Sequence, residues 1–239
     1  MAIKNLAFDG KKFDLSYELI NPTKTEDILF LHGWGSNKDI MKSAFSSHLK
    51  EYRHIYLDMP GFGKSSNNYI LTTKEYSKII KEFLNSINSN CEIVFGHSFG
   101  GKVATLLNPK NLVLLSSAGI LEEKSTNVKF KIFFAKLLNK LGLKNFTKIF
   151  RSKDVDKMSE NMYATFKNVV DEDFSSYFSN FQNSAFVFWG KEDSATSLKS
   201  GEKIANLIKK STFTSYNGDH YFFLKHSKNI CERVENGIS

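Results

Sequence analysis

Short hydrophobic runs recur along the chain and are separated by stretches that read as helices. Several runs are apolar at consecutive positions, which is typical of strands covered on both faces, whereas the first run alternates, as an edge strand does. This alternation of strand and helix predicts a largely parallel sheet with helices on its faces. The predicted strands are residues 13–20, 28–33, 54–59, 91–96, 111–116, 184–190 and 211–216, and the predicted helices are 39–50, 73–88, 98–107, 197–210 and 222–236.

The strand pattern is absent between Gly119 and Asn183. Within this segment apolar residues follow the three-and-four spacing of an amphipathic helix, and Gly142 is placed to end that helix. We expect an all-helical cap whose apolar face lines a substrate pocket or packs the cap onto the core. The expected α/β core comprises residues 1–119 and 184–239, the expected cap comprises 120–183, and the pocket candidates on its apolar face are Phe130, Phe134, Leu137 and Leu138.

Most of the net charge belongs to this insertion. The 239 residues include 33 Lys and Arg and 25 Asp and Glu, which gives a formal net charge of +8. Nine of the basic residues and no acidic ones lie between Lys124 and Lys153, so the rest of the chain is nearly neutral. We therefore expect no nucleic-acid partner. The basic segment is a solvated face, a surface for an anionic or carrier-linked substrate, or a contact with anionic lipid, the last not being favoured.

Signals for targeting, disulfides and metals are absent from the sequence. The start, MAIKNLAFDG, lacks the apolar run of a signal peptide, and no stretch approaches the roughly 20 apolar residues needed to span a bilayer. Cys91 and Cys231 are too few and too far apart for a disulfide framework or a metal-binding pair. We expect a cytoplasmic protein with reduced cysteines and no bound metal.

The glycine-rich stretch that begins at Gly96, GHSFGGK, fits two motifs. One is the GxxxxGK frame of a phosphate-binding loop, and the other is the GxSxG frame of a nucleophile elbow. A phosphate-binding loop needs a hydroxyl after its lysine to hold magnesium, and position 103 is Val. The elbow interpretation is favoured, because its glycines permit a tight turn from strand to helix with Ser98 at the tip.

A serine hydroxyl needs a histidine to take its proton and an acid to orient that histidine. Downstream of Ser98, His220 follows a predicted strand through a short turn, whereas His226 lies within the next helix, so His220 is favoured. Asp193 follows the preceding strand and is the favoured acid. Its competitors are Glu192 and Asp219, followed by the cap residues Asp171 and Glu172.

Acyl transfer also needs preorganised N–H donors for the oxyanion. One donor is expected to be the backbone of Phe99, directly after the candidate nucleophile. The other is expected from the loop after the strand 28–33, where the sequence HGWG places Trp34.

Five short motifs follow one another along the chain: LHGWGS at 31–36, DMPGFGKS at 58–65, GHSFGG at 96–101, WGKED at 189–193 and GDH at 218–220. Their order and spacing resemble the α/β-hydrolase superfamily from end to end. Within it, HGWG is similar to the loop of small cap-bearing carboxylesterases of the pimeloyl-ester type. The resemblance implies the α/β-hydrolase fold and no cofactor, and it implies a Ser98, Asp193 and His220 triad with an oxyanion hole at Trp34 and Phe99.

These features predict a serine hydrolase that cleaves a small-molecule carboxylic ester or thioester through an acyl-enzyme. A Ser nucleophile argues against dehalogenases and epoxide hydrolases of the same fold, which require a carboxylate. Two alternatives stay open: a carbon-carbon bond hydrolase or lyase that uses Ser98 as a base, and a catalytically silent module that binds through the basic cap. Acyl length and leaving group are not specified by the sequence.

Overall fold

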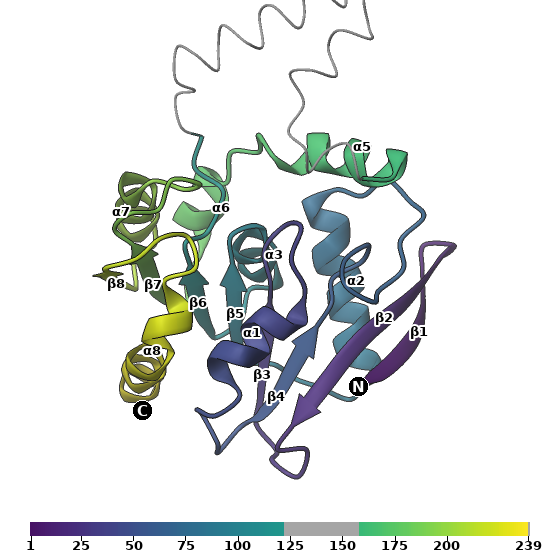
Figure 1. Cartoon of the computed structure of the whole chain (residues 1–239), viewed down its shortest axis with the longest axis horizontal. Coiled ribbons are helices and arrows are strands. Elements are labelled where there is room, and N and C mark those ends of the chain that lie inside the picture. The colour runs from purple at the N-terminus through teal and green to yellow at the C-terminus, as the bar shows by residue number, and fades with distance from the viewer. Residues whose placement is uncertain (122–157, 239) are drawn as a thin grey trace, which may run out of the picture.

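Eight strands form one sheet in the computed structural model, which describes residues 1–121 and 158–238 (Figure 1). The strand order is β1-β2-β4-β3-β5-β6-β7-β8. β2 pairs antiparallel with β1 and with β4, and every later pairing is parallel, which confirms the predicted sheet. The strands are β1 (Ala2–Phe8), β2 (Lys11–Ile20), β3 (Asp27–Leu31), β4 (Arg53–Leu57), β5 (Ile93–His97), β6 (Asn111–Leu115), β7 (Ser184–Gly190) and β8 (Ser211–Tyr216).

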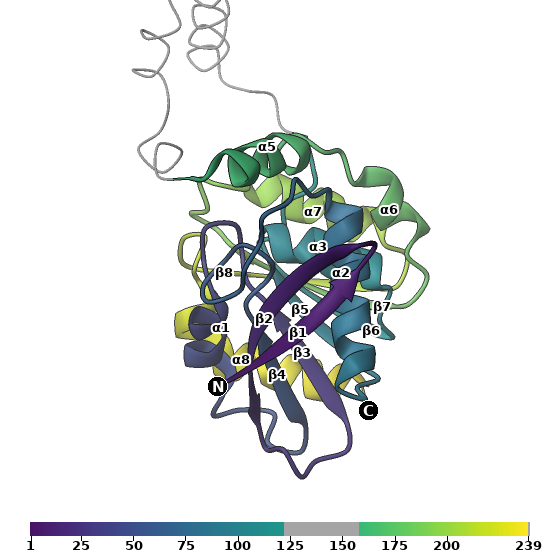
Figure 2. The same ribbon diagram turned by 90° about the vertical axis from the view of Figure 1, so that its right-hand side faces the viewer.

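Helices cover both faces of the sheet. α2, α3 and α7 pack on one face and α1 and α8 pack on the other, each set around its own buried apolar cluster. α5 and α6 belong to the segment between β6 and β7, and α5 lies across one end of the sheet (Figures 1 and 2). The helices are α1 (Lys38–Phe45), α2 (Thr73–Ser86), α3 (Phe99–Leu107), α5 (Glu160–Val169), α6 (Ser175–Asn180), α7 (Leu198–Leu207) and α8 (Phe223–Ile238).

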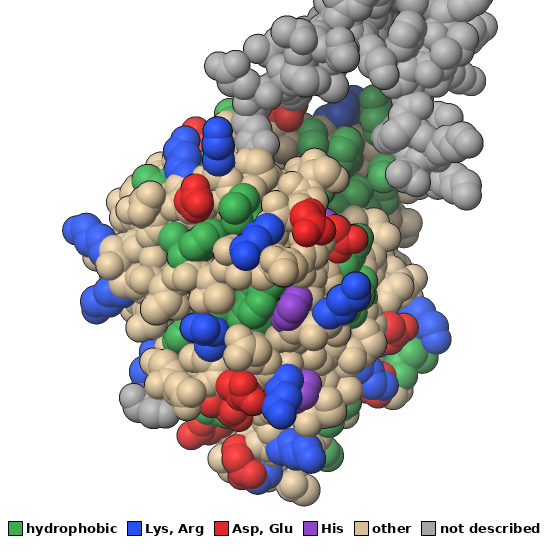
Figure 3. All heavy atoms as spheres, turned by 60° about the vertical axis from the view of Figure 1, so that its left-hand side comes forward, with side chains coloured by type: hydrophobic (Ala, Val, Ile, Leu, Met, Phe, Trp, Pro, Cys, Tyr) green, Lys and Arg blue, Asp and Glu red, His purple; other side chains and the backbone are tan. Residues whose placement is uncertain are grey.

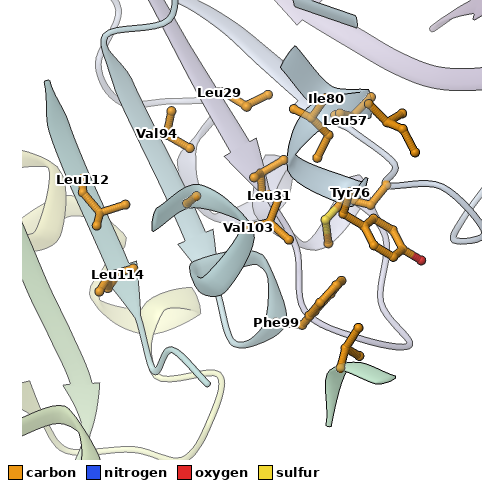
Figure 4. Close-up of a cluster of buried hydrophobic side chains, with 14 of the residues drawn as sticks. Leu29, Leu31, Leu57, Tyr76, Ile80, Val94, Phe99, Val103, Leu112 and Leu114 are labelled. Carbon is orange, nitrogen blue, oxygen red and sulfur yellow. The ribbon is translucent and has the colours of Figure 1, made fainter. Parts of the chain in front are cut away.

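The central strands explain why their sequences are apolar without interruption. Side chains alternate between the two faces of a strand, so a strand covered on both sides needs apolar residues at every position. All five residues of β3 are buried. Leu29 and Leu31 join the cluster under α2 and α3, among whose side chains Figure 4 labels them, while Ile28 and Phe30 join the cluster under α1 and α8.

The predicted edge position of residues 13–20 was wrong, because β1 occupies the edge and β2 lies between β1 and β4. Asp9 and Gly10 join β1 to β2 with φ angles of 49° and 71°. Two consecutive left-handed residues match the twist of a tight hairpin, and an Asp-Gly pair is the usual sequence signal for it. The first predicted helix was also too long: α1 ends at Phe45, and Leu49 has a φ of 49° that no helix continues through.

The loop after β4 is built around the buried carboxylate of Asp58. This carboxylate accepts hydrogen bonds from the backbone N–H of Lys38 (2.7 Å), the ammonium of Lys38 (2.8 Å) and the backbone N–H of Lys64 (3.0 Å). A side chain at Gly63, where φ is 55°, would collide with it. Although burial raises the pKa of Asp58, these hydrogen bonds outweigh it and lower the pKa. Gly63 and Lys64 of the 58–65 motif therefore help to seat this carboxylate.

Charged side chains of both signs are interspersed on the face shown in Figure 3. This agrees with the near-neutral balance expected outside the insertion. Among residues 1–121 and 158–238, no helix is long and apolar enough to cross a membrane. The basic segment from Lys124 to Lys153 lies outside the described residues, as do Phe130, Phe134, Leu137 and Leu138.

Replacing Lys38 by Met is expected to lower the free energy of unfolding by about 3–5 kcal/mol, because the buried charge of Asp58 loses its partner. The control is Lys24→Met at the Lys24–Glu51 ion pair, whose side chains are 38% and 81% exposed; it should cost at most about 1 kcal/mol. Urea denaturation monitored by circular dichroism gives both values. Equal effects of the two substitutions would contradict this role for the buried pair.

Candidate active site

Ser98 lies in a sharp turn between the end of β5 and the start of α3. Its φ of 52° and ψ of −116° are unusual for a residue with a side chain, and such conformations cost of order 1–3 kcal/mol. Glycine is required around the turn: a Cβ on Gly96 would lie 2.5 Å from the carbonyl oxygen of Gly100, and one on Gly100 would lie 2.6 Å from that of His32. The turn therefore has the geometry of a nucleophile elbow.

The phosphate-loop interpretation of the same stretch does not fit the surroundings of its lysine. The ammonium of Lys102 is buried and donates to the backbone carbonyl of Val169 and to the carboxylate of Glu172 (3.0 Å). Val103 is completely buried in the core. Neither residue is arranged to hold a phosphate and its metal ion. Across residues 1–121 and 158–238 there is also no cluster of three or more His, Cys, Asp or Glu side chains that could hold a metal.

His220 and Asp193 form a close pair beyond the ends of β8 and β7. His220 Nδ1 lies 2.7 Å from Asp193 Oδ2. Asp193 also accepts hydrogen bonds from the backbone N–H of Ala195 (2.8 Å) and from the backbone N–H and hydroxyl of Thr196 (both 2.9 Å). Burial alone would raise the pKa of Asp193, but the hydrogen bonds from His220 and Thr196 outweigh it and lower the pKa to about 2. Asp193 is thus an ionised, fixed partner for the imidazole.

The competing residues lie in other surroundings. His226 Nε2 contacts the backbone carbonyl of Asn217 at 2.9 Å, and the carboxylate of Asp219 accepts from the backbone N–H of Tyr221 at 2.8 Å. Glu192 is exposed. Among these candidates, His220 and Asp193 are joined by a hydrogen bond between their side chains. In the described part of the chain no other candidate histidine and acid are joined in this way.

His97 connects the His220 loop to the elbow. Its Nε2 donates to the backbone carbonyl of His220 at 3.0 Å, and the two imidazole rings are 4.6 Å apart. Burial lowers the pKa of His97 to about 3, so its ring is neutral. Within the described residues, the Ser98 hydroxyl makes no hydrogen bond to His220. Such contacts are often long without substrate and shorten when it binds.

The HGWG loop packs against the elbow from the other side. A Cβ on Gly33 would lie 3.1 Å from that of Ser98, so only glycine permits this approach. His32 is buried and neutral, because burial lowers its pKa to about 4. Its Nδ1 donates to the carbonyl of Gly33 (2.8 Å) and its Nε2 accepts from the N–H of Met59 (3.1 Å). These contacts anchor the loop to the segment that follows β4.

Trp34 and Phe99, the predicted oxyanion donors, are neighbours across the elbow, with ring centroids 5.5 Å apart. Inside the described part of the chain, neither backbone N–H has a hydrogen-bond acceptor, and Phe99 begins α3, where N–H groups lack helical partners. Two unpaired donors beside Ser98 are what an oxyanion would need.

A cavity of about 560 Å³ opens beside these groups and is lined in part by Ser98, Trp34 and Phe99. The predicted pocket residues on the apolar stripe lie outside the described residues. Other lining residues were not anticipated from the sequence: Lys102 from α3, and Phe166 and Val169 from α5. For Lys102 there was a signal, since it lies in the first turn of α3, the helix that begins directly after Ser98.

Comparison with known proteins identifies the family of the chain. The sequence model described as "Alpha/beta hydrolase family" matches residues 28–203, which is most of the chain. The chain belongs to this family. The hydrolase is 22% identical over 236 residues to the "Uncharacterized hydrolase YugF" of Bacillus subtilis, with 84% of this chain and 85% of that protein covered. It is 31% identical over 101 residues to the "Pimeloyl-[acyl-carrier protein] methyl ester esterase" of Proteus mirabilis, with 41% and 37% covered.

Solved structures share the fold of this hydrolase. An esterase from Exiguobacterium antarcticum aligns with a TM-score of 0.73 at 21% identity and covers 95% of this chain and 96% of its own. The enol-lactonase from Burkholderia xenovorans LB400 aligns with a TM-score of 0.74 at 15% identity and covers 98% and 99%. At these identities the likeness establishes the α/β-hydrolase fold.

The lowered pKa of Asp193 gives a prediction about stability. A carboxyl whose pKa falls from about 3.9 in the unfolded chain to about 2 in the folded protein contributes roughly 2 kcal/mol above pH 4, and this contribution is lost as the pH falls from 4 to 2. Asp193→Asn should therefore lower the free energy of unfolding by about 2 kcal/mol at pH 7 and by about half as much at pH 3.

Urea unfolding at pH 7, 4 and 3 measures this difference, with Asp219→Asn as the control on the exposed neighbouring carboxylate. A difference between wild type and Asp193→Asn that stays constant down to pH 3 would contradict the assignment of the low pKa to Asp193.

Proposed function

We propose that this hydrolase is a serine esterase or thioesterase that forms an acyl-enzyme on Ser98. The observation that carries the proposal is the hydrogen-bonded His220–Asp193 pair, whose loop is joined through His97 to the strained turn of Ser98. A nucleophile, a histidine and an oriented acid in this chain order are the requirement for activating a serine hydroxyl.

The proposed reaction follows from these positions. His220 takes the proton of Ser98 as the hydroxyl attacks the carbonyl carbon, and Asp193 stabilises the resulting imidazolium. The oxyanion accepts hydrogen bonds from the N–H groups of Trp34 and Phe99, each contributing about 3–4 kcal/mol to lowering the barrier. His220 then protonates the leaving alcohol or thiol. In the second half, His220 activates a water that releases the acid and regenerates Ser98.

We also propose that residues 1–119 and 184–239 form the catalytic core and that 120–183 form a cap. In support, α5 contributes Phe166 and Val169 to the cavity that contains Ser98. A cap in this position would surround the acyl group with apolar side chains and exclude water from the reaction. The relatives include methyl ester esterases, which favours a small-molecule ester as substrate.

The test is hydrolysis of p-nitrophenyl esters of graded acyl length. Ser98→Ala and His220→Gln should each lower kcat/KM by at least about 10⁴-fold, and Asp193→Asn by about 10⁴-fold. The matched controls His226→Gln and Asp219→Asn should stay close to wild type. The acyl length with the highest kcat/KM would indicate the length of acyl chain that the pocket accommodates.

Different outcomes would exclude the proposal. Full activity of Ser98→Ala would show that Ser98 is not the nucleophile. Equal losses of activity in His220→Gln and His226→Gln would show that His220 is not the specific base. Turnover without a burst of p-nitrophenol, together with cleavage of a carbon-carbon bond, would favour Ser98 as a base.

A further inference from the structure

The side chain of His97 links the two groups between which the proposed reaction moves a proton. A peptide bond joins His97 directly to Ser98, and its ring Nε2 donates to the backbone carbonyl of His220 at 3.0 Å. His220 is held a second time through its own ring, whose Nδ1 lies 2.7 Å from Asp193 Oδ2. The separation between Ser98 and His220 therefore depends on the side chain of His97.

Two segments pack against the buried ring of His97. From the segment after β8, the ring centroids of His220, Tyr221 and Phe223 lie 4.6, 5.2 and 4.8 Å from that of His97. The HGWG loop approaches the same ring so closely that a Cβ on Gly33 would lie 3.0 Å from its Nδ1. One ring thus contacts the loop that carries a proposed oxyanion donor and the segment that carries the proposed base.

Packing alone does not account for a histidine at this position. Nδ1 of His97 is buried and, within the described residues, has no hydrogen-bond partner. A buried acceptor without a partner costs about 1–3 kcal/mol, and a phenylalanine ring would avoid this cost. Burial lowers the pKa of His97 to about 3, so the ring is neutral and has a single N–H. That N–H, bound to the carbonyl of His220, is what histidine supplies and phenylalanine cannot.

We propose that His97 is a positioning residue that holds His220 where it exchanges a proton with Ser98 and with the leaving group. The inference rests on the proposed function, because it takes His220 as the base and acid of the reaction. His97 acts through the carbonyl of His220 rather than on the substrate. A misplacement of about 1 Å can lower a rate by about 10²-fold, so the loss of this hydrogen bond has a measurable effect.

The test uses three substitutions that differ in the donor they offer. Glutamine places its amide nitrogen as many bonds from Cα as Nε2 of histidine, so it can still donate to His220, whereas the amide of asparagine is a bond shorter. Phenylalanine fills the space with a ring that has no donor. On an ethyl ester we expect His97→Gln to stay close to wild type, and His97→Asn and His97→Phe to lower kcat/KM by about 10²-fold.

Two esters of the same acyl group separate positioning from a general loss of structure. An alkyl alcohol needs a proton from His220 as it leaves, whereas p-nitrophenolate leaves without one. A displaced His220 therefore slows hydrolysis of the ethyl ester more than that of the p-nitrophenyl ester. The ratio of kcat/KM for the ethyl ester to that for the p-nitrophenyl ester should fall at least about tenfold in His97→Phe and keep its wild-type value in His97→Gln.

His54→Phe is the matched control. His54 is buried near the start of β4, at the opposite end of the sheet from Ser98, and its Nε2 also donates to a backbone carbonyl, that of Leu49, at 2.9 Å. The substitution removes the same kind of hydrogen bond. It should lower the free energy of unfolding in urea and leave the ratio for the two esters at the wild-type value.

A purely structural His97 would lower the activity on both esters equally, and an unchanged ratio in His97→Phe would overturn the inference. Equal falls of the ratio in His97→Asn and His97→Gln would overturn it as well, and this pair decides if His97→Phe does not fold. Either result leaves the esterase proposal in place. Wild type that hydrolyses neither ester and is not labelled by a fluorophosphonate would overturn both.

Discussion

The left-handed backbone of Ser98 is the constraint on which the arrangement of the site depends. Serine keeps this backbone conformation because glycines on the surrounding segments let those segments approach more closely than side chains would permit. Gly96 and Gly100 let β5, α3 and the end of β3 meet, and Gly33 brings the HGWG loop against Ser98 itself. The strain of the turn is offset by the packing of the elbow between two buried apolar clusters.

The buried histidines and the buried carboxylates around this turn differ in charge and in structural role. His32 and His97 are neutral because burial lowers their pKa, and they act as hydrogen-bonding spacers between backbone segments. Asp58 and Asp193 remain ionised because each accepts several hydrogen bonds. The first carboxylate fixes a loop, and the second orients His220. Of these three histidines, His220 is the one whose ring contacts a carboxylate.

The sequence predicted the sheet well where short-range signals exist, and the assignment of the site residues stays a prediction. Apolar runs identified the central strands because both faces are buried, and the ordered motifs placed Ser98, Asp193 and His220 after the ends of β5, β7 and β8. The sequence was less informative where the role of a residue depends on contacts with distant parts of the chain. Lys102 was considered only as part of a phosphate-loop motif, since its partners Val169 and Glu172 lie about 70 residues away in the chain. The edge strand β1 was missed because its apolar and polar residues alternate only weakly, although Asp9-Gly10 carries a hairpin signal.

Covalent labelling tests whether Ser98 is an activated nucleophile without any assumption about the substrate. We predict that an alkyl fluorophosphonate modifies the folded protein at a single residue, that peptide mass spectrometry locates the adduct on Ser98, and that Ser98→Ala and His220→Gln are not labelled at the same dose. Folded wild-type protein that stays unlabelled, or that carries the adduct on another residue, would contradict the account.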